Sequence, residues 1–374
     1  MSLRLSVSEY QAAFQGELFP ALEEALGRLP ERYGRFVQVL EFVLVDAVVL
    51  PAWPGGPGRP PEDRRALARA FLAKAVFDVP TTRALIERLQ IDGTLRRLCG
   101  WTRAGAVPSE ATFSRAFAAF AMSGLPERLH AGLVAKTLGP RLVGHISRDA
   151  TAIPARERAT PKPAKRKRRR GRPRKGEQRP PRRRLERQQA MTLSEMLADL
   201  PRACDVGTKR NAKGYKESWT GYKLHIDAAD GGVPVSCILT SASLHDSQVA
   251  LPLAHLTAGR VTNLYDLMDS AYDAKEIRAC SKELGHVPII DPNPRTRARK
   301  LELEAEARAR RVANRLPADR QRLQERTNVE RVNGRLKDEC GGRRIHVRGP
   351  VKVMAHLMFG ICVLSVDQLI RMLH

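Results

Sequence analysis

Apolar residues in the first part of the chain recur at helical spacing. The pattern is clearest in RALARAFLAKAVF (65–77), PTTRALIERLQIDGTLRRL (80–98) and PSEATFSRAFAAFA (108–121). Ser109 and Glu110, just before the last apolar stripe, are residue types that favour a helix N-terminus. We therefore predict an all-α N-terminal domain over residues 1–140. Short helices joined by tight turns fit a helix-turn-helix DNA-binding domain and a plain helical bundle equally well.

Beyond residue 140 the pattern changes to short apolar runs that alternate with helical segments. Strands are predicted at 142–148, 222–228, 233–239, 263–268 and 287–290. Helices are predicted at 245–257 and 273–284, over most of 301–342, and as a buried helix at 353–366. This order predicts an α/β domain over residues 141–374 with a mixed five-stranded sheet.

A strongly basic segment lies between the first two predicted strands. Residues 162–187 contain 15 Lys or Arg and two Glu, with many Pro and few large apolar side chains. Such a composition buries too little apolar surface to offset chain entropy. We therefore predict a disordered basic insertion at about 156–205.

The net charge of the chain favours a polyanionic partner. Its 374 residues carry 65 Lys or Arg against 40 Asp or Glu, which gives a formal charge of +25. Codon bias explains scattered Arg but not the dense cluster of the insertion, so nucleic acid is the expected partner. The six Cys form no CxxC pair, and the N-terminus has no apolar signal region. We expect reduced, structural cysteines, a cytoplasmic protein and no membrane span.

Three acidic residues stand where a metal site could form. Asp149 follows the first predicted strand, Asp269 follows the fourth, and Glu330 lies on a late helix. This order is similar to the RNase H-like arrangement of polynucleotidyl transferases, in which the corresponding acids meet. Three carboxylates repel one another unless a divalent cation lies between them, and oxygen ligands favour Mg²⁺ or Mn²⁺.

The late helix combines this acid with two basic residues. Arg326, Glu330 and Lys337 fall on one face at about 100° per residue, while Val329, Val332 and Leu336 fall on another. A carboxylate flanked by cations suits a metal site that also holds phosphate. A solvated helix with surface ion pairs is the alternative explanation of the same spacing.

These motifs together resemble a bacterial insertion-sequence transposase of the DDE type. The sequence is similar to the branch marked by Y-(2)-R-(3)-E-(6)-K in the final catalytic helix, although Leu323 stands where that motif has Tyr. The matching segments are PSEATFSRAF (108–117), RDATAI (148–153), GYKLH (221–225), LHDS (244–247), MDSAYDA (268–274), RTNVERVNGRLK (326–337) and HLMFGICVLSVDQL (356–369).

The resemblance implies a fold, a reaction and roles for particular residues. It implies an RNase H-like catalytic core in which Asp149, Asp269 and Glu330 are the catalytic metal ligands and hold two ions of Mg²⁺ or Mn²⁺. Arg326 and Lys337 would hold DNA phosphates. The implied reaction is metal-dependent cleavage at the terminal inverted repeats, followed by attack of the freed 3′-OH on target DNA. The partners would be double-stranded DNA and a second copy of the chain.

Two other functions remain open on the same residues. The chain is alternatively a catalytically inactive or domesticated DNA-binding protein derived from a transposase. It is alternatively an RNase H-like nuclease without strand transfer. The presence of Asp149, Asp269 and Glu330 favours the active transposase.

The basic insertion contains a second candidate DNA contact. Arg170-Gly171-Arg172-Pro173-Arg174-Lys175 resembles an AT-hook, in which an extended segment lies in the minor groove. A polycation that binds phosphates without sequence preference is the simpler interpretation. On either interpretation Arg170, Arg172, Arg174 and Lys175 are expected to contact DNA.

Further polar residues near the predicted sheet are expected to be structural. We expect Asp227 and Asp230 to belong to a hairpin, Asp246 to cap a helix, and Asp266 to support the acids from a distance. His145, His225 and His245 lack the spacing of metal ligands.

Overall fold

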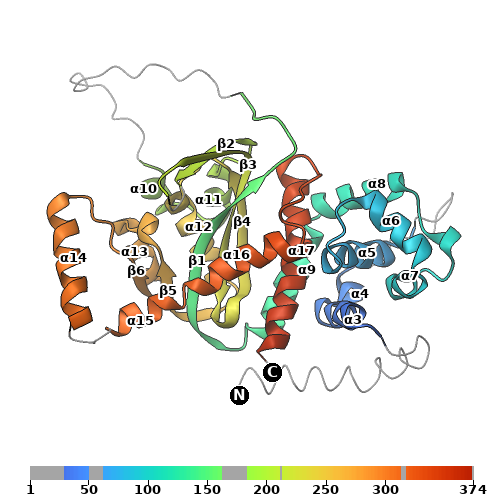
Figure 1. The fold of residues 1–374 in the computed structure, drawn as a ribbon, viewed down its shortest axis with the longest axis horizontal. Coiled ribbons are helices and arrows are strands. Elements are labelled where there is room, and N and C mark those ends of the chain that lie inside the picture. The colour runs from blue at the N-terminus through green and yellow to red at the C-terminus, as the bar shows by residue number, and fades with distance from the viewer. Residues whose placement is uncertain (1–28, 50–61, 162–182, 211–212, 313–316, 373–374) are drawn as a thin grey trace.

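Residues 29–49, 62–161, 183–210, 213–312 and 317–372 are described by a computed structural model (Figure 1). Helices come first along the chain, and a mixed sheet with further helices follows. Figure 1 shows the C-terminal helix α17 (Pro350–Arg371) between the sheet and the N-terminal helices. Helix α17 packs against both groups, including α5, α9 and β4.

The N-terminal region is helical, as predicted. Its elements are α3 (Glu31–Val43), α4 (Val45–Val48), α5 (Arg64–Val76), α6 (Thr82–Ile91), α7 (Gly93–Cys99), a 3-10 turn η1 (Ala104–Ala106), α8 (Glu110–Met122) and α9 (Leu125–Thr137). The predicted helix 80–98 divides at Asp92, because that carboxylate accepts from the backbone N–H of Leu95 (2.9 Å) and starts a new helix. Phe71 of α5 stacks on Phe359 of α17 with ring centroids 5.7 Å apart, so the two regions share one hydrophobic core.

The sheet is mixed and contains one strand more than predicted. The strands are β1 (Leu142–Pro154), β2 (Asp205–Arg210), β3 (Lys216–Ala229), β4 (Val233–Ser241), β5 (Thr262–Met268) and β6 (Val287–Ile290). Their order is β2-β3-β1-β5-β6, with β4 also paired to β3. Strand β1 is antiparallel to β3 and parallel to β5, and β5 is parallel to β6. The α/β fold with a mixed sheet is confirmed, but the prediction of five strands is wrong.

The missed strand, β2, has no apolar run to reveal it. Its sequence is DVGTKR, and its side chains are mostly exposed. The strand forms because β3 begins at Lys216, earlier than predicted, and pairs with β2 from Arg210↔Lys216 to Asp205↔Gly221. Backbone pairing, not side-chain burial, therefore defines β2.

Two short helices occupy part of the segment predicted to be disordered. They are α10 (Arg184–Gln188) and α11 (Leu193–Asp199). Arg184 and Arg187 both pair with Asp199, at 2.7 and 2.9 Å, so these arginines have a structural role. Met196 packs in a hydrophobic cluster with residues of two later helices. The expectation of disorder is therefore wrong for these helices, and residues 162–182 lie outside the described part of the chain.

The remaining helices belong to the part of the chain that follows β4. They are α12 (Ala250–Ala258), α13 (Lys275–Glu283), α14 (Arg297–Val312), α15 (Ala318–Gln324), α16 (Thr327–Glu339) and α17, with 3-10 turns η2 (Asp230–Gly232), η3 (Asp246–Val249) and η4 (Ser270–Tyr272). Helix α12 packs on β3 and β4, and α16 packs on β1, β3 and β4. By length and composition α17 is the one helix among the described residues that could cross a membrane, but 83% of its apolar window is buried inside the protein. This is the position of a core helix, as predicted for 353–366.

Candidate active site

Asp149 and Asp269 occupy neighbouring positions on two parallel strands. The β1–β5 register ends at the pair Arg148↔Met268, and each aspartate is the next residue along its strand direction. Adjacent strands lie about 4.8 Å apart, which keeps the two carboxylates near each other. The prediction that the first strand ends at Asp149 is wrong, because β1 continues to Pro154 along β3. Asp149 instead marks the point where β5 separates from β1.

Both aspartates are partly buried, and this disfavours their charged forms. Burial raises the pKa of Asp149 to about 6, and the nearby charge of Asp269 adds to that effect. Burial also raises the pKa of Asp269, although its carboxylate accepts from the backbone N–H of Ala271 at 2.9 Å. The positive charge of Arg326 lowers the pKa of both aspartates. A positive charge close to the two aspartates would therefore stabilise their ionised forms.

Helix α16 packs over β1 with the two faces that the spacing predicted. Val329, Val332 and Leu336 are fully buried against the core. On the other face Glu330 pairs with Arg326 at 2.7 Å, and the Glu330 side chain is half exposed. Lys337 is partly buried; burial lowers the pKa of its ammonium, and the charge of Asp149 opposes that shift. The Asp149 carboxylate therefore interacts electrostatically with both Arg326 and Lys337.

Asn333 connects this helix directly to the aspartate pair. Its Nδ2 donates a hydrogen bond of 2.9 Å to Oδ2 of Asp149. Asn333 lies three residues after Glu330 on α16, so the two side chains share a face. The sequence did not identify Asn333 as a site residue. The predicted site on this helix rested on the spacing of the charged residues Arg326, Glu330 and Lys337, and Asn333 is an uncharged polar residue on an already polar face.

Arg148 supports the site from the opposite face of the sheet. Successive side chains of a strand alternate between faces, so Arg148 points away from Asp149. Its guanidinium makes two hydrogen bonds of 2.7 Å to Asp227, and both residues are fully buried. Thr257 of α12 donates to the same carboxylate at 2.7 Å. Asp227 lies in the β3–β4 hairpin, as expected, but its buried side chain also forms an ion pair with Arg148 of β1.

Asp246 also differs from its expected role. The N-cap of η3 is His245, whose ring accepts from the backbone N–H of Ser247, and Asp246 follows it. The Asp246 carboxylate accepts from Nζ of Lys223 at 2.8 Å. Its negative charge raises the pKa of both Asp149 and Asp269. A fourth acid therefore contributes to the electrostatics of the site.

The other polar residues have structural partners. Asp230 accepts from backbone N–H groups of β1 and pairs with His145 at 2.9 Å. Asp266 pairs with His286 at 3.2 Å, and the charge of Asp266 acts on Arg148. The ring of His225 is hydrogen bonded to Thr240. All six cysteines are buried and free, as expected of structural thiols.

The donor set fits a hard divalent cation, although the third acid is not gathered with the other two. Within the described residues no three His, Cys, Asp or Glu side chains are close enough to hold a metal ion. Two buried polar atoms near the pair, Oη of Tyr272 and Oδ1 of Asn333, have no hydrogen-bond partner among the described residues. Groups of this kind usually bind water or an ion when buried. Two carboxylates of raised pKa beside such atoms suit a hydrated Mg²⁺.

The structure brings only some of the predicted site residues together. Asp149 and Asp269 are neighbours, Arg326 and Lys337 act on them electrostatically, and Glu330 is on the same helix face but paired with Arg326. Leu323, which stands in place of the motif Tyr, lies on α15. The candidate DNA contacts Arg170, Arg172, Arg174 and Lys175 lie outside the described residues.

Comparison with known families matches both parts of the chain. Residues 145–366 match the family model described as "Transposase DDE domain". Residues 22–119 match the model described as "Transposase domain (DUF772)". No curated protein matches the chain. No solved structure matches it either. Since the first model covers more than half of the chain and includes Asp149, Asp269 and Glu330, the protein belongs to the family of transposases with a DDE domain.

Proposed function

We propose that the protein is an active DNA transposase of an insertion sequence. It cleaves at the terminal inverted repeats by metal-dependent hydrolysis and joins the freed 3′-OH to target DNA. The observation that carries the proposal is that Asp149 of β1 and Asp269, which directly follows β5, occupy neighbouring positions of two adjacent parallel strands, with α16 packed against β1. That helix brings Glu330 and two basic residues to the same side of the sheet.

In this proposal Asp149, Asp269 and Glu330 would hold two metal ions, either Mg²⁺ or Mn²⁺. Metal ions bound there would activate the attacking oxygen and stabilise the leaving oxygen of a phosphodiester. The charge of Arg326 lowers the pKa of both aspartates, and this effect supports a cation at this position. Glu330 is half exposed and would leave its ion pair with Arg326 to join the two aspartates.

The chain's own residues would orient the acids and the DNA. Asn333 fixes Oδ2 of Asp149 through its amide hydrogen bond, so that the other carboxylate oxygen remains available. Once released by Glu330, the Arg326 guanidinium would bind a DNA phosphate. Lys337, which lies two helical turns after Glu330, would bind a second phosphate.

The proposed partners are double-stranded DNA and a second copy of the chain bound to the paired transposon ends. Arg170, Arg172, Arg174 and Lys175 of the basic insertion would contact the duplex, as a minor-groove hook or as a polycation. Since the substrate is chromosomal DNA in a bacterial cell, we propose action in the cytoplasm.

An in vitro reaction with the terminal inverted repeats tests the proposal. The wild-type protein should nick the ends with Mg²⁺ and join them to a target plasmid, while Asp269→Asn and Glu330→Gln should lose both steps. Glu87→Gln, an exposed acid on α6, is the matched control and should retain activity. Nicking that survives Asp269→Asn contradicts the site. Binding without cleavage by the wild-type protein indicates a non-cleaving descendant, and cleavage without joining indicates a nuclease.

A further inference from the structure

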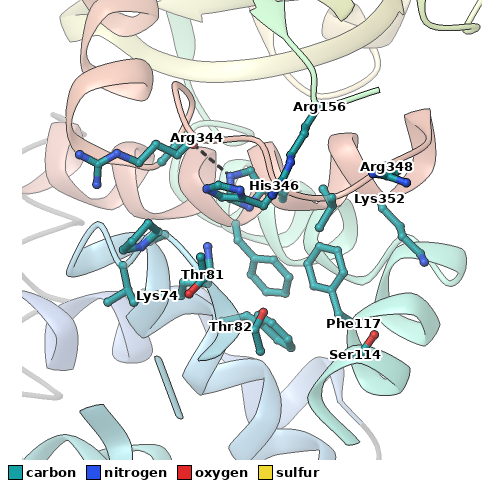
Figure 2. Close-up of a pocket in the computed structure, with 18 of the residues that line it drawn as sticks. Lys74, Thr81, Thr82, Ser114, Phe117, Arg156, Arg344, His346, Arg348 and Lys352 are labelled. Atoms are coloured by element: carbon teal, nitrogen blue, oxygen red, sulfur yellow. Dashed lines mark hydrogen bonds between the residues drawn. The ribbon is translucent and has the colours of Figure 1, made fainter. Parts of the chain in front are cut away.

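A polar cavity lies between the N-terminal helices and the segment that follows α16, and neither Asp149 nor Asp269 lines it. Its volume is about 470 Å³. Figure 2 shows side chains of α5, α6 and α8 on one side and Arg344, His346, Arg348 and Lys352 on the other. Phe117 and Phe359 line its apolar part, with ring centroids 6.4 Å apart. We call this cavity the junction pocket.

Positive charge dominates the junction pocket. Its basic lining residues are Lys74, Arg156, Arg344, Arg348 and Lys352. Its single lining acid, Glu110, pairs with Arg83 at 3.5 Å. Arg344 pairs with Asp78 at 3.5 Å. Among the residues that the structure describes, the other four basic side chains make no ion pair.

These cations act on one another across the cavity. The pKa of Lys74 is lowered to about 8 because the ammonium is buried, and Asp78 only partly opposes this shift. Burial lowers the pKa of His346, and the charges of Lys74, Arg156 and Arg344 lower it further. The pKa of His356 falls to about 4, again through burial and then through Lys74. An anion in the pocket would relieve this repulsion.

The backbone adds to the positive field. Thr82 is the first residue of α6, Glu110 is the first residue of α8, and Lys352 lies in the first turn of α17, and all three residues line the pocket. The N-terminus of a helix carries a partial positive charge and free N–H groups. Three such ends therefore support the basic side chains around one cavity.

The pocket is also joined to the elements of the candidate active site. Arg156 lies two residues beyond the end of β1, which carries Asp149. Cys340, which lines the pocket, directly follows α16, which carries Glu330 and Lys337. A ligand held in the pocket would therefore contact extensions of both elements and the N-terminal helices together.

We propose that the junction pocket binds phosphates of the DNA backbone and clamps the duplex between the N-terminal helices and the catalytic domain. This proposal rests on the proposed function, because DNA is the ligand, but it concerns a contact distinct from Arg326, Lys337 and the basic insertion. A phosphodiester supplies the anionic oxygens that Arg and Lys bind. The contact would add to affinity without reading sequence, as backbone contacts do.

The test measures DNA affinity of the full chain without metal ions, so its outcome does not depend on cleavage. Arg348→Gln combined with Lys352→Gln removes two exposed charges from the pocket. Lys275→Gln combined with Lys282→Gln removes two exposed charges from α13 and is the matched control. Fluorescence anisotropy with a labelled duplex should be recorded at several salt concentrations. The pocket variant should bind more weakly, and the slope of log affinity against log salt should flatten by about 0.9 per lost phosphate contact.

A chemical footprint provides an independent measurement. Lys74 should react with acetic anhydride at mildly alkaline pH, because its lowered pKa leaves much of the amine neutral. Duplex DNA should protect Lys74, while Lys282 should remain reactive. An unchanged salt slope in the pocket variant, or equal flattening in the α13 control, overturns the proposal. Protection of Lys74 by inorganic phosphate but not by duplex DNA also overturns it, because the ligand is then a free phosphate.

Discussion

Asn333 on α16 donates a hydrogen bond to Asp149 on β1, and this bond joins two residues that lie 184 positions apart in the sequence. The other polar atom of this amide, Oδ1, is buried and has no hydrogen-bond partner among the described residues. The contact fixes the orientation of the carboxylate that the proposed metal ions need. We therefore predict that Asn333 acts as a positioning residue for Asp149.

Replacing this amide should impair cleavage without unfolding the protein. Groups that orient a metal ligand are typically worth about 10–100-fold in metal affinity or activity. We expect Asn333→Ala to reduce the single-turnover cleavage rate by about that factor, with partial recovery at high Mg²⁺. Asn328→Ala, a buried amide on the same helix that hydrogen bonds to Glu325, is the control. Equal losses in the two variants would mean that Asn333 acts only through helix stability.

The raised pKa of Asp149 predicts a pH dependence of stability in the metal-free protein. The folded carboxyl has a pKa of about 6, above its ordinary value, so the folded state binds a proton more tightly than the unfolded state. Stability is therefore lost as pH rises from about 4 to about 6, by at most about 3 kcal/mol. Asp149→Asn should remove this loss and raise the stability of the metal-free protein at neutral pH.

Urea unfolding midpoints at acidic and neutral pH measure this effect. In the presence of a chelator, Asp149→Asn should exceed the wild type at neutral pH and match it at pH values below about 4. The control is Asp319→Asn, an exposed acid on α15. A neutral-pH midpoint that Asp149→Asn leaves unchanged would falsify the burial of charge at this position.

Local patterns were sufficient to predict five of the six strands and the buried face of α16. Periodicity depends only on near neighbours, so Val329, Val332 and Leu336 could be assigned to the core. The similarity to the RNase H-like arrangement implied that Asp149 and Asp269 lie together, and the β1–β5 register places them next to each other. The family resemblance is confirmed as well, whereas the roles of the site residues and the Y-R-E-K branch remain predictions.

The features that the sequence patterns did not predict depend on contacts between residues that are distant in sequence. Arg148 and Asp227 each looked like an ordinary polar residue, and only the β1–β3 pairing places them opposite each other. Composition indicated disorder around 184–199, but Asp199 neutralises Arg184 and Arg187 and permits two helices there. Charge counting treats every arginine alike and cannot identify those already paired.

The Arg148–Asp227 pair predicts that mutations of the two residues have large and non-additive effects on stability. Removal of one partner leaves an uncompensated buried charge and typically costs about 3–5 kcal/mol. Arg148→Met should therefore lower the unfolding midpoint strongly, and so should Asp227→Leu. The double variant should recover much of the loss, because apolar replacements can be neutral when both charges are removed.

Thermal unfolding of the two single variants and the double variant measures this coupling. The exposed pair Arg299 and Glu302 on α14, at 2.9 Å, provides the comparison. Its removal should change stability by about 1 kcal/mol or less. Additive effects at Arg148 and Asp227 would show that the two side chains do not stabilise each other.

Deletions in the basic insertion should separate DNA binding from folding. Removal of residues 162–182 deletes most of the cluster, including Arg170, Arg172, Arg174 and Lys175, and leaves α10 and α11 in place. DNA affinity should fall and its salt dependence should flatten, because fewer counterions are released on binding. Removal of residues 162–187 also deletes Arg184 and Arg187, the ion-pair partners of Asp199, so it should lower the unfolding temperature as well. The measurements are anisotropy with labelled duplex and thermal unfolding of both deletions. A shorter deletion that destabilises the protein as much as the longer one would contradict the structural role of α10, and an unchanged salt slope would exclude the cluster from phosphate contact.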